Sequence, residues 1–185
     1  MKRPLRALSV STALAAAAVT GLAAAPSAGA HDSPGHRPSA GPRAAAGEAE
    51  LASVRAATAR YHRVEAALAD GYRPSPECAA SPDGVMGVHY VNPARLGSID
   101  PRRPAILLYV PTENGPRLAG VEYFQADADQ DPTTDDDRPS LFGQPFDGPM
   151  PGHEPGMPVH YDLHVWLWAH NPAGTFAPWN PALSC

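Results

Sequence analysis

The sequence predicts an α+β domain in which one N-terminal amphipathic helix packs on a mainly antiparallel sheet of about four or more strands. Three observations support this prediction. Residues 48–69 show helical periodicity, four later segments show strand patterns, and the connections between those strands, except the last, are short. Short connections favour antiparallel neighbours, because parallel strands need long crossovers.

Residues 48–69 are expected to form the helix. Charged side chains occupy the positions between the apolar ones, so the segment has one apolar face. Gly71 stands where a helix commonly ends, and Pro74 and Pro76 prevent its continuation. The apolar face consists of Leu51, Val54, Thr58, Tyr61, Val64 and Leu68.

The predicted strands lie at 86–92, 105–110, 118–125 and 159–170. The second is continuously apolar, so we expect it in the centre of the sheet. Asn114-Gly115 stands between the second and third strands and is a strong hairpin signal. The sequence therefore predicts that these two strands pair antiparallel.

Residues 126–157 form an unusually long connection before the fourth strand. Their first part, 127–138, is acidic and has no periodic pattern. The second part carries Phe142, Phe146 and Met150 among glycines and prolines, so we expect it to pack on the domain. Long connections of this kind serve as functional lids or are disordered, and the sequence leaves both open.

Residues 1–30 have the features of a secretory signal peptide. Three basic residues precede an apolar segment, and Ala28-Gly29-Ala30 matches the small-residue cleavage rule. The predicted mature protein begins at His31, is secreted, and keeps no stable membrane span.

The predicted mature chain has two parts. Residues 31–47 are rich in Pro, Gly, Ala and Ser and are expected to form a flexible tail, which leaves 48–185 as a single secreted domain. The only two cysteines, Cys78 and Cys185, are expected to form a disulfide, because an exported chain enters an oxidising compartment.

The charge of the chain bears on its partners. The formal net charge is −5, and Lys2 is the only lysine. The sequence has no basic patch with interleaved aromatic residues, so we expect no binding to nucleic acid. A small molecule or a glycan is the more compatible partner.

Residues 159–170 carry the strongest functional signal, because every second residue is apolar. Alternate side chains of a strand point to opposite faces, so one face is predicted to join the core. A solvent-exposed face normally carries Lys, Thr, Glu or Ser, and the composition of the other face therefore predicts a binding site. That face would present His160, Asp162, His164, Trp166, Trp168 and His170.

We expect one divalent transition metal ion to bind some of the histidines and carboxylates in this domain. Glu122 lies inside an apolar strand, where a carboxylate is unfavourable unless it is paired, hydrogen-bonded or bound to a metal. Imidazoles with carboxylates suit Zn²⁺, Cu²⁺, Mn²⁺ or Fe²⁺. The candidate ligands are His89, Glu122, His153, His160, Asp162 and His164.

Three of these candidates also have interpretations without a metal. Glu122 could form a salt bridge with an arginine or lie at a solvated edge. His89 could be a hydrogen-bonded core histidine, and His153 could lie in a surface turn.

Strand geometry limits the His-x-x-x-His pair. The Cα atoms of His160 and His164 would lie about 13 Å apart on a strand, which is a long span for one ion. Asp162 with either neighbouring histidine is a better nucleus for a site, and an Asp beside a ligating His commonly orients its ring.

Trp166 and Trp168 support a different class of function. Exposed indoles on one strand face can stack on sugar rings. The alternative is therefore a metal-free carbohydrate- or ligand-binding module, and a structural envelope protein is a third possibility. Whether the protein is an enzyme stays open, because the metal interpretation covers both metal handling and an unidentified metal-assisted reaction.

Four blocks of the sequence stand out: MGVHYVNP (86–93), GVEYF (120–124), LFGQPFDGP (141–149) and GMPVHYDLHVWLWAHNPAG (156–174). They resemble those of a family of secreted bacterial proteins of unknown function. The resemblance covers most of the region from the helix to Cys185. It implies a folded, exported domain and carries no activity that can be transferred.

Overall fold

The structure, a computed structural model, describes residues 42–185. The predicted signal peptide and the predicted tail as far as residue 41 lie outside the described residues. The first helix begins at Pro42, so residues 42–47 belong to this helix and not to a tail. Proline is favoured at the first helical position and alanine has the highest helix propensity, which explains the earlier start.

The predicted helix is divided and not continuous. The backbone of Arg63 is extended, with φ −96° and ψ 110°, and this interrupts the helix. Just before the interruption, the Tyr61 carbonyl accepts a hydrogen bond from the Tyr109 hydroxyl of the sheet at 2.5 Å. The helical elements are α1 (Pro42–Thr58), the 3₁₀ turn η1 (Ala59–His62) and α2 (Val64–Ala69).

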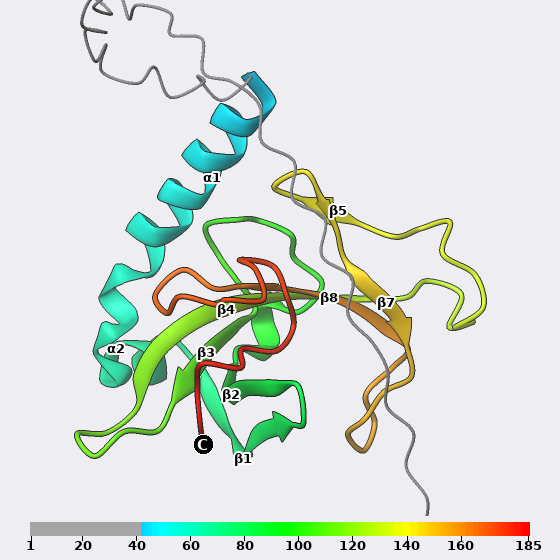
Figure 1. The fold of residues 1–185 in the computed structure, drawn as a ribbon. Coiled ribbons are helices and arrows are strands. Elements are labelled where there is room, and N and C mark those ends of the chain that lie inside the picture. Colours follow the sequence, from blue (N-terminus) through cyan, green and yellow to red (C-terminus); the bar gives the residue numbers. More distant parts are fainter. Residues whose placement is uncertain (1–41) are drawn as a thin grey trace, which may run out of the picture. The chain divides into compact units, whose positions relative to one another are not determined.

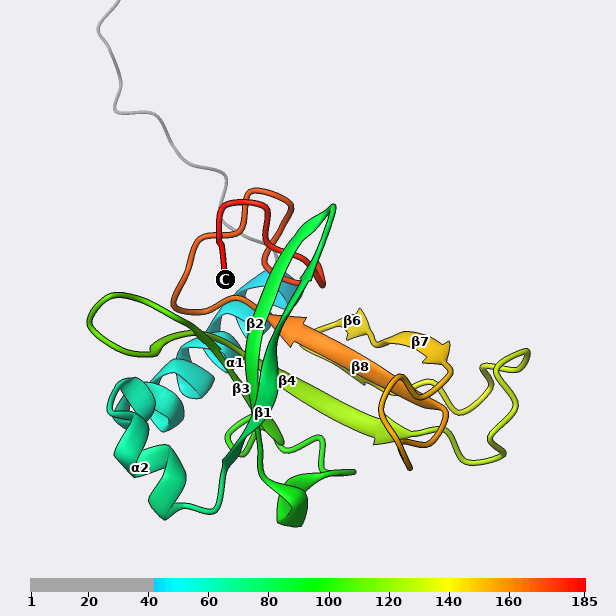
Figure 2. The ribbon, with the colours of Figure 1, turned by 90° about the horizontal axis from the view of Figure 1, so that it is seen from below.

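Six antiparallel strands form one sheet in the order β1-β2-β3-β4-β8-β7. The predicted α+β class with a mainly antiparallel sheet is confirmed. Figures 1 and 2 show a curled sheet with α1 and α2 on one side of it. The strands are β1 (Arg73–Ser81), β2 (Gly84–Val91), β3 (Ile106–Val110), β4 (Arg117–Ala126), β7 (Asp147–Met150) and β8 (His160–Val165).

β3 and β4 form the predicted hairpin. The turn between them is closed by reciprocal backbone bonds between Thr112 and Gly115. Gly115 has φ +99°, a conformation that suits glycine at this position. Every residue of β3 is buried, which confirms its predicted central place.

β1 is a strand that the sequence analysis missed. The sequence analysis used Pro74 and Pro76 only to end the helix, and both lie within this strand although proline has no N–H to donate to a ladder. The structure resolves this by placing β1 at the edge of the sheet, with a shift of register between Pro74 and Cys78. An edge strand tolerates proline, since one row of its backbone groups has no neighbouring strand.

β8 is shorter than predicted, because the chain leaves the ladder after Val165. The N–H of Trp166 already donates to the Thr175 carbonyl, and those of Trp168 and Ala169 both donate to the Ala119 carbonyl. The expected alternation as far as residue 170 is therefore wrong beyond 165. The strand departs where tertiary contacts with β4 and the C-terminal segment replace regular pairing.

The long connection 126–157 packs on the domain in its second part, as predicted. Phe142 and Phe146 are buried, and β7 pairs with β8. Two short strands, β5 (Ser140–Leu141) and β6 (Gln144–Pro145), form a separate two-stranded sheet within it.

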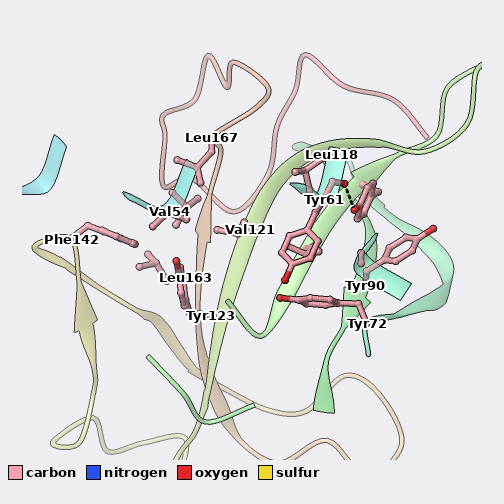
Figure 3. Packing of buried hydrophobic residues seen from close by; sticks show 14 of the residues in the cluster. Val54, Tyr61, Tyr72, Tyr90, Leu118, Val121, Tyr123, Phe142, Leu163 and Leu167 are labelled. Atoms are coloured by element: carbon pink, nitrogen blue, oxygen red, sulfur yellow. Dashed lines mark hydrogen bonds between the residues drawn. The ribbon is translucent and has the colours of Figure 1, made fainter. Parts of the chain in front are cut away.

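Both faces of the main sheet are buried, by different parts of the chain. The helices and the 140–146 segment cover one face, where Val54 and Tyr61 belong to the larger core with Tyr123, Leu163 and other residues (Figure 3). A smaller core lies on the opposite face of the sheet, because its residues alternate along β3 with those of the larger core. It contains Ile106, Leu108, Phe124 and Trp166, and Met157 and Leu183 pack against it. The candidate site lies beside this smaller core.

The predicted disulfide is present. Cys78 of β1 is bonded to Cys185, 107 residues later. Closing a loop of this length contributes about 4–5 kcal/mol to stability in the chain-entropy model.

Among residues 42–185, no helix has the length and apolar character needed to cross a membrane.

Candidate metal centre

Three of the six predicted ligands come together on the sheet. His89 of β2, Glu122 of β4 and His164 of β8 each offer one ligand atom, and these atoms lie within 4.8 Å of one another. Glu122 Oε2 is 3.1 Å from His89 Nε2 and 3.6 Å from His164 Nε2. One carboxylate oxygen thus faces two imidazoles.

The strand register explains this arrangement. Glu122 is the direct cross-strand partner of His164, so their side chains are neighbours on one face. His89 reaches Glu122 across β3, where its own cross-strand partner is Leu108. Leu108 in turn is the cross-strand partner of Gly120 on β4. A Cβ atom at Gly120 would lie 2.8 Å from the Val165 carbonyl oxygen. Because Gly120 has no side chain, the backbone at the end of β8 can lie close to β4.

The centre of the site is buried. His164 is 1% exposed and Glu122 is 5% exposed. Within the described residues, Glu122 Oε2 and both ring nitrogens of His164 have no partner of hydrogen-bonding geometry. Buried polar atoms of this kind are rare, because each loses its bonds to water without replacement. A cation between Glu122 Oε2 and His164 Nε2 would satisfy these two atoms, whereas His164 Nδ1 faces away from such an ion, toward Asp162.

Electrostatics favours the ionised carboxylate. Burial by itself raises the pKa of Glu122, but the charges of His164 and His89 outweigh this and lower it. Burial lowers the pKa of His164, but Glu122 and Asp162 outweigh this and raise that pKa to about 9. The charged partners of Glu122 are therefore histidines, and the salt bridge to an arginine considered from the sequence is not the one that forms.

Asp162 lies behind the ring of His164. Its Oδ1 atom is 3.5 Å from His164 Nδ1, the nitrogen opposite the one that faces Glu122. Asp162 is 4% exposed, and the structure adds Asp147 of β7 as its cross-strand partner. The sequence analysis missed Asp147, because it stands alone among glycines and prolines without any pattern.

His153 and His160 lie apart from the group of three. Their rings are 5.4 Å apart between centroids, and the ring of His160 stacks on Phe124 at 4.7 Å. His160 Nδ1 is 3.0 Å from the Pro158 carbonyl oxygen. This separation follows from the spacing, because four residues of extended strand cannot bring His160 and His164 to one ion. Asp162 likewise lies outside the group of three ligands.

Trp166 and Trp168 do not form the expected exposed platform. Trp166 is 4% exposed, belongs to the smaller core, and donates from Nε1 to the Ala177 carbonyl. Trp168 packs against the larger core and meets the ring of His62 edge-on at 4.3 Å. The two indoles pack in different cores. Because β8 ends at Val165, the alternation of a regular strand does not apply to them.

Comparisons with protein-family models, with curated proteins and with solved structures find no match to this chain. The function must therefore be inferred from the arrangement of the chain's own side chains. The group of His89, Glu122 and His164 is its clearest feature.

Proposed function

We propose that this is a secreted protein that binds one divalent transition metal ion through His89, Glu122 and His164. The observation that carries the proposal is the meeting of three potential ligand atoms, and among them Glu122 Oε2 and His164 Nε2 are buried side-chain atoms without a hydrogen-bond partner in the described part of the chain. A buried carboxylate between two imidazoles is stabilised by a divalent cation, because the cation replaces the lost hydration of all three groups.

The ligand set narrows the choice of metal. Two imidazoles and one carboxylate form the protein ligands of many catalytic zinc sites and of non-haem Fe²⁺ sites. Both cysteines are held in the disulfide, so no thiolate contributes. We therefore place Zn²⁺ and Fe²⁺ ahead of Cu²⁺ and Mn²⁺.

The proposed site suits chemistry better than permanent storage. Sites with three protein ligands keep coordination positions for water or a substrate, whereas structural sites are closed by a fourth ligand. Bound metal would lower the pKa of water or polarise a substrate oxygen. Asp162 would hold His164 in the orientation that presents Nε2 to the ion.

Export is part of the same proposal. The signal-like residues 1–30, the resemblance to secreted bacterial proteins and the Cys78–Cys185 disulfide all support it.

Elemental analysis of the exported, untagged protein tests the metal site. We expect close to one metal ion per chain in the wild type, retained in His153→Ala and lost in His164→Ala and Glu122→Gln. His153 is the matched control, because it is an exposed histidine outside the group of three. Circular dichroism on each variant would show whether it is folded, and Glu122→Gln keeps the shape of the side chain.

Two results would overturn the proposal. One is a wild type that takes up none of the four candidate metals after incubation with each. The other is a folded Glu122→Gln variant that retains the full metal content.

A further inference from the structure

A hollow of about 520 Å³ lies over one face of the sheet, beside the proposed metal site. Val91 of β2, Ile106 of β3 and Phe124 of β4 contribute strand residues to it, and the segments 96–97 and 154–158 form its walls. Its lining is mainly apolar. The volume lies within the range of pockets that bind small molecules.

The strand register places this hollow next to the metal ligands. Ile106 is the cross-strand neighbour of both Val91 and Glu122. Val91 is two residues beyond His89, and Phe124 is two residues beyond Glu122. Residues two apart on a strand share a face and lie about 6.6 Å from each other. The floor of the hollow therefore continues directly from the metal ligands.

The least buried ligand points to the route of access. The side chain of His89 is 19% exposed, whereas those of Glu122 and His164 are 7% and 1% exposed. Val91, on the same strand as His89, is half-buried. A molecule that lies in the hollow and extends along β2 therefore reaches the site at its most accessible ligand.

The hollow is built into the fold. The N–H of Gly97 donates to the Phe124 carbonyl at 3.1 Å, which ties one wall to β4. The Phe124 ring stacks on His160, and His160 Nδ1 contacts the Pro158 carbonyl of the other wall. Both walls are thus connected to the floor, as in pockets that exist before a ligand binds.

We infer that the hollow binds the apolar tail of a small molecule whose oxygen donor group coordinates the metal. The lining favours an apolar tail over a highly polar one, because Gln125 and Glu154 are the only polar side chains among the lining residues. The metal supplies the attachment for the polar end, so this inference rests on the proposed function. The substrate class is then a short aliphatic or aromatic compound with one metal-binding oxygen group.

Two hydroxamates test the inference on the zinc-loaded full chain. Acetohydroxamate and octanohydroxamate carry the same metal-binding group and differ only in the length of the alkyl tail. By titration calorimetry, we expect octanohydroxamate to bind at least about tenfold more tightly, because burial of each added methylene is favourable. Equal affinities on zinc-loaded protein would overturn the inference and leave the metal site standing.

A matched pair of variants localises the effect. Leu96 lines the hollow and Ile99 does not, yet both are 42% exposed. We expect Leu96→Asp to reduce the preference for octanohydroxamate at least about fivefold, with acetohydroxamate binding unchanged, and Ile99→Asp to behave as the wild type. Equal effects of the two variants would place the tail elsewhere and overturn the inference.

Zinc content is measured on the same samples. A wild type that takes up neither zinc nor any of the other three candidate metals would overturn the proposed function and this inference together. A zinc-loaded wild type without a chain-length preference would overturn only the inference, so the two failures are distinguishable.

Discussion

His89 Nε2 and Glu122 Oε2 approach each other to 3.1 Å although β3 lies between their strands. These two side chains meet only when β2, β3 and β4 are assembled and the sheet is curled. Any ion that binds both of them therefore binds the folded state in preference to the unfolded chain. Metal binding and folding are thermodynamically linked in such a site.

Metal is expected to stabilise the protein through this linkage. Free Zn²⁺ at 100 times its dissociation constant should raise the free energy of unfolding of the wild type by about 2.7 kcal/mol. Glu122→Gln should remove this increase, and His170→Ala, which changes an exposed histidine, should keep it. Urea unfolding with and without a chelator measures the difference, and the same zinc response in Glu122→Gln as in the wild type would exclude the carboxylate as a ligand.

Asp162 is expected to act on the metal through His164. Asp162→Asn should weaken metal binding about 10- to 100-fold and leave one site per chain, because the imidazole loses the carboxylate that orients it. Competition with a chromogenic chelator measures the affinity. Glu113→Gln, a change of an exposed carboxylate in the β3–β4 turn, is the control, and an effect of equal size there would show that Asp162 has no specific role.

Asp70 is expected to make stability depend on acid pH. The Tyr61 hydroxyl donates to its Oδ2 atom at 2.6 Å, and this bond, with Arg60 and Arg95, lowers the pKa of Asp70 below its ordinary value of 3.8. The folded state therefore holds the Asp70 proton less tightly than the unfolded chain does. The contribution of Asp70 is fully present above the unfolded pKa and is lost as the pH falls through the lower, folded pKa.

The comparison of Asp70→Asn with the wild type measures this contribution. Urea unfolding between neutral pH and pH of about 3 should show a smaller acid-induced loss of stability in the variant. Asp83→Asn, at an exposed position, should follow the wild type. Parallel curves for Asp70→Asn and the wild type would contradict the assignment.

Gly120→Ala is expected to disturb the close approach of the end of β8 to the neighbouring strand β4. The added Cβ atom would lie 2.8 Å from the Val165 carbonyl oxygen, so the backbone would have to move. We expect a loss of about 1–3 kcal/mol in the free energy of unfolding. Gly47→Ala in α1 is the control, because the nearest atom to its Cβ would be 3.7 Å away, and it should be neutral or slightly stabilising. Equal stability of the two variants would show that Gly120 is not needed for this close approach.

Local patterns determined much of the fold. Asn114-Gly115 between two apolar runs predicted the β3–β4 hairpin, because the turn chemistry and the strand pattern are both local properties. The α+β class followed from one helical segment and several strand segments. Cys78 and Cys185 were the only two cysteines, so their number, together with the predicted export, predicted their pairing.

Local patterns failed where a distant contact changed the outcome. The helical periodicity of the sequence continued through Arg63, but the helix is interrupted there. The interruption follows Tyr61, whose carbonyl accepts a hydrogen bond from the Tyr109 hydroxyl. The alternation of residues 159–170 continued past Val165, but bonds to Ala119 and Thr175 end the strand. β1 was missed because Pro74 and Pro76 were considered only as residues that end the helix, and the sequence does not show that this segment lies at an edge of the sheet, where proline is tolerated.

The sequence by itself determined which residue types were available for a site, and Glu122 stood out because a carboxylate in an apolar strand requires a partner. Only the tertiary structure decided that His89 and His164 are those partners and that His153 and His160 are not. The physical reason is that a strand pattern specifies the face on which a side chain lies, whereas the register and curl of the sheet specify its neighbours on that face.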